Sequence, residues 1–182
     1  MQDLVDFAKE NPKKITVSGA GMFVGHHIAL LQFQKAAGIQ LTYIPEKGGV
    51  PAMQSVVAAK VKEGFNNLSD AFRNQERIKI LAVADLERHE FLPDVKTFKE
   101  MGVDVDDSSV NFRGVAFPKG VPQEFIDKCA AGFANLFYDK KVIAKMKACG
   151  SPVRVIPRDK VIKMFQDRQK YLEGLLKELR KK

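Results

Sequence analysis

The sequence predicts an α/β fold for this chain of 182 residues, and three observations indicate it. Strand-like and helix-like segments alternate along the first half, at the spacing that parallel βαβ units show. Glycines stand within 19–21 and at 48–49, where predicted strands turn into predicted helices. The run over 78–84 is nearly all apolar, which is typical of a strand buried on both faces of a parallel sheet.

The first half of the chain carries most of the predicted strands. Gly38 follows an apolar helical pattern and readily takes the left-handed conformation with which many helices end. Pro51 falls in the first turn of a predicted helix, where proline is tolerated, and Ser69 is a suitable N-cap for another helix. The predicted order is a helix that stops at Asn11-Pro12, a strand over 15–17, a helix over 26–37, a strand over 39–44, a helix over 50–59, a strand over 61–65, a helix over 70–74 and a strand over 78–84.

The second half differs in its predicted secondary structure, with fewer strands and longer helices. Asp139 stands between two helical patterns and is the predicted cap of the second one. Pro157 begins a long helix with one apolar face. The predicted order is an extended entry at 92–95, a helix over 96–101, a strand over 110–117, a turn over 118–122, helices over 123–136 and 140–148, a strand over 153–156 and the C-terminal helix.

Composition allows a buried core and argues against two kinds of partner. Apolar residues make up 45% of the chain, yet no apolar run approaches the roughly 18 residues of a membrane span. The amphipathic first segment lacks the apolar stretch of a signal peptide, so we expect a cytoplasmic protein or an exported one whose leader is absent from this sequence. Five of the eight net positive charges lie in the helical tail over 158–182, so no nucleic-acid partner is predicted.

The two cysteines, Cys129 and Cys149, form no CxxC motif, so neither a redox motif nor a zinc knuckle is indicated. One interpretation is that they are two small apolar side chains buried in neighbouring helices. A disulfide bond between these helices, formed in an oxidising compartment, is the alternative.

The stretch SGAGMFVGHHIA, residues 18–29, joins a strand, a glycine-rich turn and a helix N-terminus. Free backbone N–H groups and the positive end of the helix dipole make such a turn an anion site. Its glycines, spaced GxGxxxG, match neither the P-loop nor the dinucleotide fingerprint. Adjacent histidines on a helix point about 100° apart, which argues against a metal site. No GxSxG motif marks Ser18 as a nucleophile. We therefore expect a histidine here to hydrogen-bond the loop backbone.

Three further loops carry groups of the same kind. Gly48 and Gly49 precede a helix N-terminus, and Asn67 and Ser69 follow a strand. Arg113 stands beside a glycine, where a guanidinium suits a bidentate contact with a carboxylate, and a surface ion pair is the alternative for this residue. Together these loops offer hydrogen-bond donors to an anion and little acid–base machinery. They favour binding over catalysis, and neither a cofactor nor a metal is predicted.

Several segments, taken in order, resemble one family. They are SGAG followed by HHIALL, YIPEKGGVPA over 43–52, FNNLS over 65–69, ILAV over 80–83, LPDVKTF over 92–98, NFRGV over 111–115 and PKG over 118–120. Each piece alone is unspecific. In this order and spacing, along the whole chain, they resemble the extracytoplasmic solute receptors of tripartite tricarboxylate transporters, the Bug/TctC family.

The resemblance implies a type II periplasmic-binding-protein fold, in which two α/β lobes close over a small carboxylate without catalysis. Such receptors begin with a segment of about 100 or more residues, the size of one lobe. That segment carries a PxxPGG-type loop, which this sequence lacks. We expect one complete lobe over 1–107, and over 108–182 a crossover strand and C-terminal helices that belong to the other, incomplete lobe. The chain is then a fragment or a product truncated at its start.

The same resemblance implies a small di- or tricarboxylate ligand, the membrane subunits of a transporter as partners, and a periplasmic location. Apolar surface left open by an incomplete lobe further predicts self-association. His27 is predicted to organise the glycine loop. The predicted ligand contacts are the backbone and hydroxyl donors of Ser18, Gly19, Ala20 and Gly21, the N–H groups of Gly48 and Gly49, and the side chains of Asn67, Ser69 and Arg113.

Two residues depart from the family's pattern. His26 stands where an acidic residue is common, and Glu46 stands where an aromatic or small apolar residue is common. Two other functions stay open at this point. An enzyme would use SGAG for a phosphorylated substrate and a histidine as general base. A partner-binding remnant would have lost ligand binding together with its first lobe.

Overall fold

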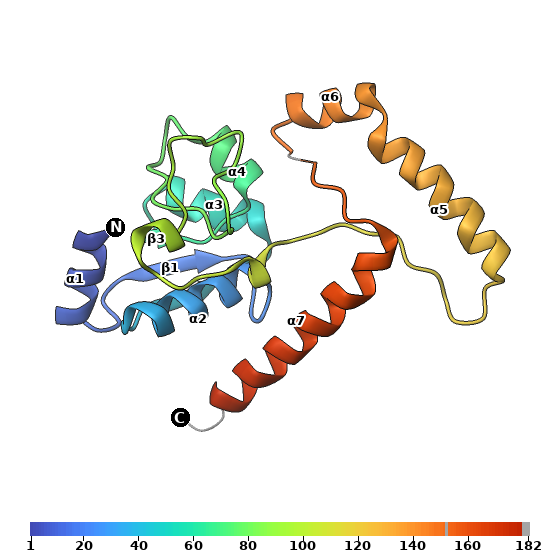
Figure 1. Ribbon diagram of the computed structural model, residues 1–182. Helices are drawn as coiled ribbons and strands as arrows, with labels where there is room; N and C mark the ends of the chain where they lie inside the picture. The colour runs from blue at the N-terminus through green and yellow to red at the C-terminus, as the bar shows by residue number, and fades with distance from the viewer. Residues whose placement is uncertain (152, 180–182) are drawn as a thin grey trace. The chain divides into compact units, whose positions relative to one another are not determined.

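The structure is a computed structural model that describes residues 1–151 and 153–179. It contains two compact units, Met1–Phe112 and Arg113–Lys182 (Figure 1). The first unit combines a parallel sheet with helices, and the helices of the second unit are α5, α6 and α7. The predicted α/β class is confirmed, whereas the lobe boundary at residue 107 stays a prediction.

The first unit is built on a three-stranded parallel sheet with the strand order β2-β1-β3. The central strand β1 (Thr16–Gly19) pairs with β2 (Thr42–Pro45) on one side and with β3 (Glu63–Gly64) on the other. Because the three strands are parallel, their carboxyl ends lie at one edge of the sheet. The loops that follow the strands therefore meet at that edge.

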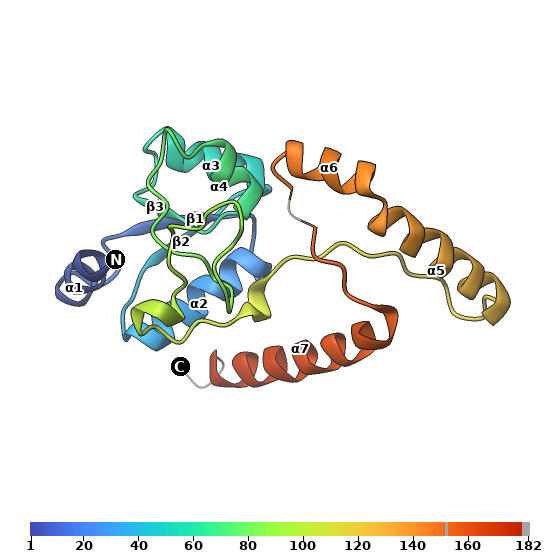
Figure 2. The ribbon, with the colours of Figure 1, turned by 45° about the horizontal axis from the view of Figure 1, so that its top comes forward.

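Helices cover both faces of this sheet. One face is covered by α2 (Gly25–Ala37), and the opposite face by α3 (Gly49–Val57) and α4 (Leu68–Arg73), as Figures 1 and 2 show. The N-terminal helix α1 (Gln2–Glu10) agrees with the predicted amphipathic segment. Gly38 ends α2 at a φ of 64°, in the left-handed conformation predicted for it.

The core of the first unit joins β1, α2 and the chain beyond residue 97. Val17, Leu30 and Val105 are each at most 1% exposed, and the rings of Phe33 and Phe98 lie 5.2 Å apart between centroids. Two short 3-10 helices follow Phe98 in the chain. They are η1 (Lys99–Met101) and η2 (Asp107–Ser109). The core holds α2 against β1, and so positions the turn between them.

The second unit contains α5 (Gln123–Tyr138), α6 (Lys140–Ala148) and α7 (Arg158–Leu179). Asp139 caps α6 as predicted, because its carboxylate accepts the backbone N–H groups of Lys141 and Val142 at 2.8 and 3.0 Å. No residue of α5 or α6 is buried. Large apolar side chains of α5 are therefore exposed, namely Phe125, Phe133, Leu136, Phe137 and Tyr138.

Two predictions about the chemistry of the chain can be set beside the structure. Cys129 and Cys149 are not joined by a disulfide bond, and neither is buried, since Cys129 is half-buried and Cys149 is exposed, so both interpretations of the pair are wrong. Within 1–151 and 153–179, no helix has both the length and the apolar character needed to cross a bilayer.

Three predicted strands are wrong. Residues 78–84, 110–117 and 153–156 are irregular, apart from a single parallel bridge between Val83 and Thr97. The predicted helix over 96–101 is also wrong in kind, since only the 3-10 turn η1 forms there. A strand needs a partner for its N–H and C=O groups. β3 at the edge of the sheet is paired over only two residues, and the described part of the second unit contains no strand at all.

Candidate functional site

Three loops meet at the carboxyl edge of the sheet in the first unit. The backbone N–H of Glu46 donates to the Gly19 carbonyl at 2.8 Å, which joins the second loop to the end of β1, where the first loop begins. A Cβ placed on Gly49 would lie 2.8 Å from Nδ2 of Asn67, so the third loop lies against the start of α3. The loops are residues 20–24 after β1, residues 46–48 after β2 and residues 65–67 after β3.

His26 links the first of these loops to the third. Its Nδ1 accepts the backbone N–H of Ala20 at 3.0 Å, and its Nε2 lies 3.1 Å from Oδ1 of Asn67. Since Nδ1 accepts a hydrogen bond, the neutral ring carries its proton on Nε2 and donates it to Asn67. The side chain is only 5% exposed. His26 is therefore a structural bridge under the site, a role that the sequence did not predict for it.

A polar network continues from Asn67. Its Nδ2 donates to Asp70 at 3.1 Å, and its Oδ1 also accepts from Nδ2 of Asn111 at 2.7 Å. The other carboxylate oxygen of Asp70 accepts from Arg73 at 2.6 Å, and Asp70 is almost fully buried. Both ends of the Asn67 amide are thus used within the protein. The amide of Asn67 holds the loops together, and its contact with a ligand stays a prediction.

His27 contacts the glycine loop from the first turn of α2. Its Nδ1 accepts the backbone N–H of Phe23 at 3.1 Å, and its ring stacks on Tyr43 with 4.3 Å between centroids. The Tyr43 hydroxyl in turn donates to the Gly21 carbonyl at 2.7 Å. His27 is 6% exposed, so both histidines are turned inward and both accept a backbone N–H. Neither is placed to act as a general base on a bound substrate.

Two of the predicted ligand donors are used inside the fold, and these predictions are corrected here. The Ser18 side chain is fully buried and its hydroxyl donates to the Ala52 carbonyl at 2.9 Å. The Ala20 N–H donates to His26, as described above. Gly19 lies beneath the loop, where a Cβ would meet the ring of Tyr43 at 2.8 Å. Gly21, at a φ of 143°, is half-buried in this loop, whereas Gly19 is buried.

The start of each helix at this edge still offers N–H groups. The first backbone bond of α2 runs from Ile28 N–H to Val24, and that of α3 from Ala52 N–H to Gly48. The N–H groups of Gly25 and Gly49 precede these bonds, in the turn where a helix leaves its donors without intrahelical partners. Two helix dipoles therefore present their positive ends at the same edge of the sheet.

Ser69 and Arg113 are the remaining predicted contacts. Ser69 is not the cap of α4, because Asn67 takes the N-cap position and Ser69 falls within the helix. Arg113 is exposed and is the first residue of the second unit. Its contact with a ligand stays a prediction. In the described part of the chain, no three His, Cys, Asp or Glu side chains gather in a group that could hold a metal ion.

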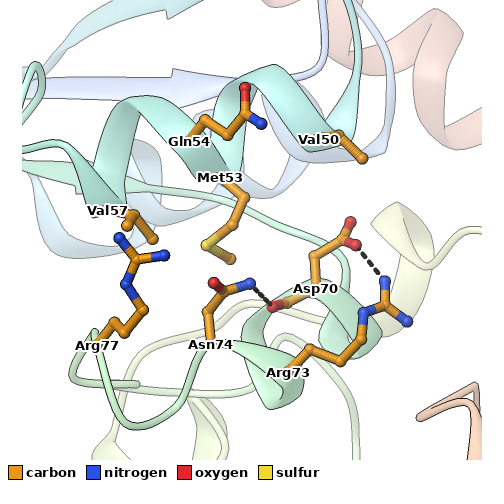
Figure 3. A pocket seen from close by; sticks show the side chains of 8 residues that line it. All are labelled: Val50, Met53, Gln54, Val57, Asp70, Arg73, Asn74 and Arg77. Carbon is orange, nitrogen blue, oxygen red and sulfur yellow. Dashed lines mark hydrogen bonds and ion pairs between the residues drawn. The ribbon is translucent and has the colours of Figure 1, made fainter.

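A cavity of about 250 Å³ lies beside the site, between α3 and α4 (Figure 3). Its apolar side is formed by Val50, Met53 and Val57, and Asp70 faces them with its ion pair to Arg73. The Asn74 side chain donates to the Asp70 carbonyl at 2.9 Å. The cavity shares Val50 and Asp70 with the first turns of α3 and α4, so it borders the edge where the loops meet.

The buried histidines make the stability of the first unit depend on pH. Burial holds the pKa of both rings below the ordinary 6.5, and for His26 the Asn67 hydrogen bond and the Asp70 charge oppose this in part. The unfolded chain then binds protons at a higher pH than the folded chain. The stabilisation is complete above pH 6.5 and decreases as the pH falls towards the folded pKa values, by up to about 1.4 kcal/mol per pH unit for each histidine.

Urea unfolding on either side of pH 6.5 measures this dependence. In a variant with both His26→Gln and His27→Gln, the dependence in this window should disappear, although the variant starts from a lower stability. A wild-type stability that stays constant through the window would contradict the neutral, backbone-accepting state of the two rings.

A model of the tripartite tricarboxylate transporter family receptors, TctC, matches residues 1–180. The chain belongs to this family. The TctC membership confirms the resemblance that the segments in the sequence indicate. A curated relative of this TctC chain, the UPF0065 protein in the tcbD-tcbE intergenic region of Pseudomonas sp. (strain P51), is 28% identical to it over 149 residues.

The TctC chain is shorter than its relatives. The aligned part covers 81% of this chain but 44% of the Pseudomonas protein, so the chain spans less than half of that relative's length. Among solved structures, a periplasmic transporter aligns with a TM-score of 0.82 and 22% identity, over 97% of this chain and 59% of that one.

Two other solved structures of similar shape were determined with ligands. Rpa4515 of R. palustris with adipate aligns with a TM-score of 0.76 and 20% identity, over 95% of this chain and 58% of that one. MatC of Rhodopseudomonas palustris with bound malate aligns with a TM-score of 0.72 and 20% identity, over 96% and 60%. At these identities the likeness shows the fold, and it confirms the predicted periplasmic-binding-protein architecture.

Four residues of the site were missed in the sequence analysis. They are His26 in its bridging role, Tyr43, Asp70 and Asn111. In the parallel register Tyr43 pairs with Val17, two residues before Gly19. The strand pairing could therefore have placed this aromatic residue close to the glycine turn. Asp70 could also have been found, because it stands three residues after Asn67, as the third residue of the helix that Asn67 caps. Asn111 gave no comparable signal, because its contact with Asn67 depends on how the chain after η2 folds back.

Proposed function

We propose that this chain is part of an extracytoplasmic solute-binding receptor and binds a small carboxylate with the loops of its first unit. The observation that carries the proposal is the convergence of two helix N-termini on one sheet edge, joined by the His26–Asn67 contact of 3.1 Å. Backbone N–H groups with fixed positions suit a carboxylate, because they need no side-chain ordering on binding.

The proposed donors differ in part from those that the sequence predicts. Gly21, Gly25 and Gly49 are proposed to donate their N–H groups to the carboxylate, and Gly48 shapes the start of α3 at a φ of 139°. Lys47, exposed in the second loop, supplies a positive charge nearby. Ser69 and Arg113 remain proposed contacts from their own elements. The adipate and malate held by the two similar structures are both dicarboxylates, which supports this ligand class.

The receptor role also suggests how the chain is organised and where it works. We assign the first unit to one complete lobe and the second unit to part of the other lobe. The membrane subunits of a tripartite tricarboxylate-type transporter are the proposed partners, and the periplasm is the proposed location. The exposed apolar side chains of α5 support the further proposal that this unit associates with another polypeptide surface, including a second copy of the chain.

A pair of variants at Val50 tests the donor arrangement. Val50 is 60% exposed in the first turn of α3, so Val50→Asp places a negative charge at the helix N-terminus without disturbing the core. The introduced side-chain carboxylate should compete with the ligand for the N–H groups and repel it. The affinity for carboxylate ligands should therefore fall about tenfold or more. Val50→Asn changes the same side chain without adding charge, and should lower the affinity much less.

Isothermal titration calorimetry with a panel of mono-, di- and tricarboxylates measures this difference. Equal affinities for the two variants would contradict the proposed donors. A folded chain that releases no heat with any carboxylate would instead favour the partner-binding remnant. The enzyme alternative lacks its general base, because His26 and His27 each accept a backbone N–H and lie inside the fold.

A further inference from the structure

Three consecutive apolar side chains are exposed on the loop that follows β1. Met22, Phe23 and Val24 are 52%, 54% and 42% exposed, and they lie between Gly21 and Gly25, which carry two of the proposed carboxylate donors. Single exposed apolar residues are common on protein surfaces, whereas a contiguous group marks a place where something apolar binds. We call this group the apolar ledge.

The ledge is held in place by buried residues. Phe23 has a φ of 57°, a left-handed conformation that is unfavourable by about 1–2 kcal/mol for a residue with a side chain. Its N–H donates to the buried His27, whose ring lies 5.2 Å from the Phe23 ring and stacks on Tyr43. The fold therefore maintains an unfavourable backbone conformation that leaves Phe23 at the surface.

The charges around the ledge are few. The three loops, residues 20–24, 46–48 and 65–67, contain one acidic and one basic residue, Glu46 and Lys47. Glu46 accepts a hydrogen bond of 2.6 Å from the Ser55 hydroxyl. Helix N-termini and one lysine suffice for a single carboxylate. A second carboxylate held directly over the ledge, as in a short dicarboxylate, would lose hydration and find no cation in these loops. At the far end of a chain of four methylene groups, a second carboxylate reaches past the ledge into water.

We infer that the ligand is a carboxylate with an apolar body, either an aromatic ring or an aliphatic chain of at least four methylene groups. One carboxylate binds at the N–H groups of Gly21, Gly25 and Gly49, and the apolar body lies on the ledge. This inference rests on the proposed function, since it concerns the same site. It separates this chain from receptors for short, hydroxylated or highly charged carboxylates.

The experiment compares adipate, succinate and citrate by amide chemical-shift titration of the 182-residue chain, a method that also detects weak binding. Each methylene buried on the ledge adds about a fourfold gain in affinity, so adipate, with two methylene groups more, should bind about 15-fold more tightly than succinate. In Met22→Ser and in Val24→Ser, the ratio of the two affinities should fall towards one. Phe7→Ser, at a half-exposed aromatic of α1 outside these loops, is the matched control and should keep the wild-type ratio.

The outcomes separate the inference from the function on which it rests. If succinate or citrate binds as tightly as adipate while the amides of Gly21 and Gly25 shift, the apolar ligand class is wrong and the carboxylate site stands. A preference for adipate that survives both ledge variants also overturns the inference, because the apolar body must then lie elsewhere. If no carboxylate shifts these amides in a chain with a well-dispersed spectrum, both proposals fail.

Discussion

Replacement of His26 by alanine should lower the free energy of unfolding of the first unit by about 3 kcal/mol, one of the two largest effects that we expect in this chain. The substitution removes a buried ring and leaves the Ala20 N–H without its partner. It also removes one of the two contacts of Asn67 Oδ1, which keeps only the hydrogen bond from Asn111. Because the glycine loop then loses its tie to Asn67, carboxylate binding should weaken together with stability.

Urea unfolding followed by circular dichroism measures the change in stability. His89→Ala is the matched control, because His89 also accepts a backbone N–H, that of Phe91 at 3.2 Å. Within residues 1–151 and 153–179, no second hydrogen bond of the His89 ring joins it to another loop, as the bond from His26 to Asn67 does. This control should lose no more than about 1 kcal/mol. Equal losses for the two variants would show that the bridge to Asn67 adds nothing.

Gly25→Ala should have an effect of similar size for a different reason. A Cβ at Gly25 would collide with the carbonyl oxygen of Ser109 and would lie 2.8 Å from Oδ1 of Asn111. The first of these atoms belongs to the backbone, so it cannot turn away and the chain near η2 has to shift. We expect a loss of about 2–3 kcal/mol. The Asn111–Asn67 hydrogen bond of 2.7 Å should break.

Two measurements identify this effect. Unfolding by urea gives the loss in stability, and amide hydrogen exchange at Val110, whose N–H donates to Asp107 at 3.0 Å, reports whether the chain near η2 has loosened. Gly114→Ala is the control, since nothing lies within 4 Å of a Cβ at that position and its φ imposes no left-handed conformation. A Gly25→Ala variant as stable as the Gly114→Ala variant would contradict the close approach of the two segments.

The helices could be predicted from the sequence because their signals are local. Gly38 ends α2 and Asp139 caps α6, and each of these residues acts within one turn of its own helix. The strand over 78–84 was wrong for the opposite reason. Its apolar character indicates burial, and its residues are half-buried apart from the exposed Lys79, but pairing depends on a neighbour elsewhere in the chain. Periodicity carries no information about that neighbour.

The candidate site shows the same division. The glycines near the strand ends could be predicted, since a turn followed by a helix N-terminus is a local pattern. The hydrogen bonds of Ser18 and Ala20 could not, because their partners, Ala52 and His26, are fixed only when the loop closes over the sheet. Donors that look free in a sequence can already have partners in the fold.

The position of Met22, Phe23 and Val24 also has an evolutionary consequence. These residues belong neither to the buried core cluster nor to the hydrogen bonds among Asn67, Asp70 and Asn111. Their backbone contributes the Phe23 N–H bond to His27 and the Val24 carbonyl that accepts from Ile28, and neither bond depends on the side chains of Met22 and Val24. Substitutions at Met22 and Val24 can therefore accumulate with little effect on folding. Gene duplicates could diverge in ligand preference through this short loop alone, while the architecture beneath it is inherited unchanged.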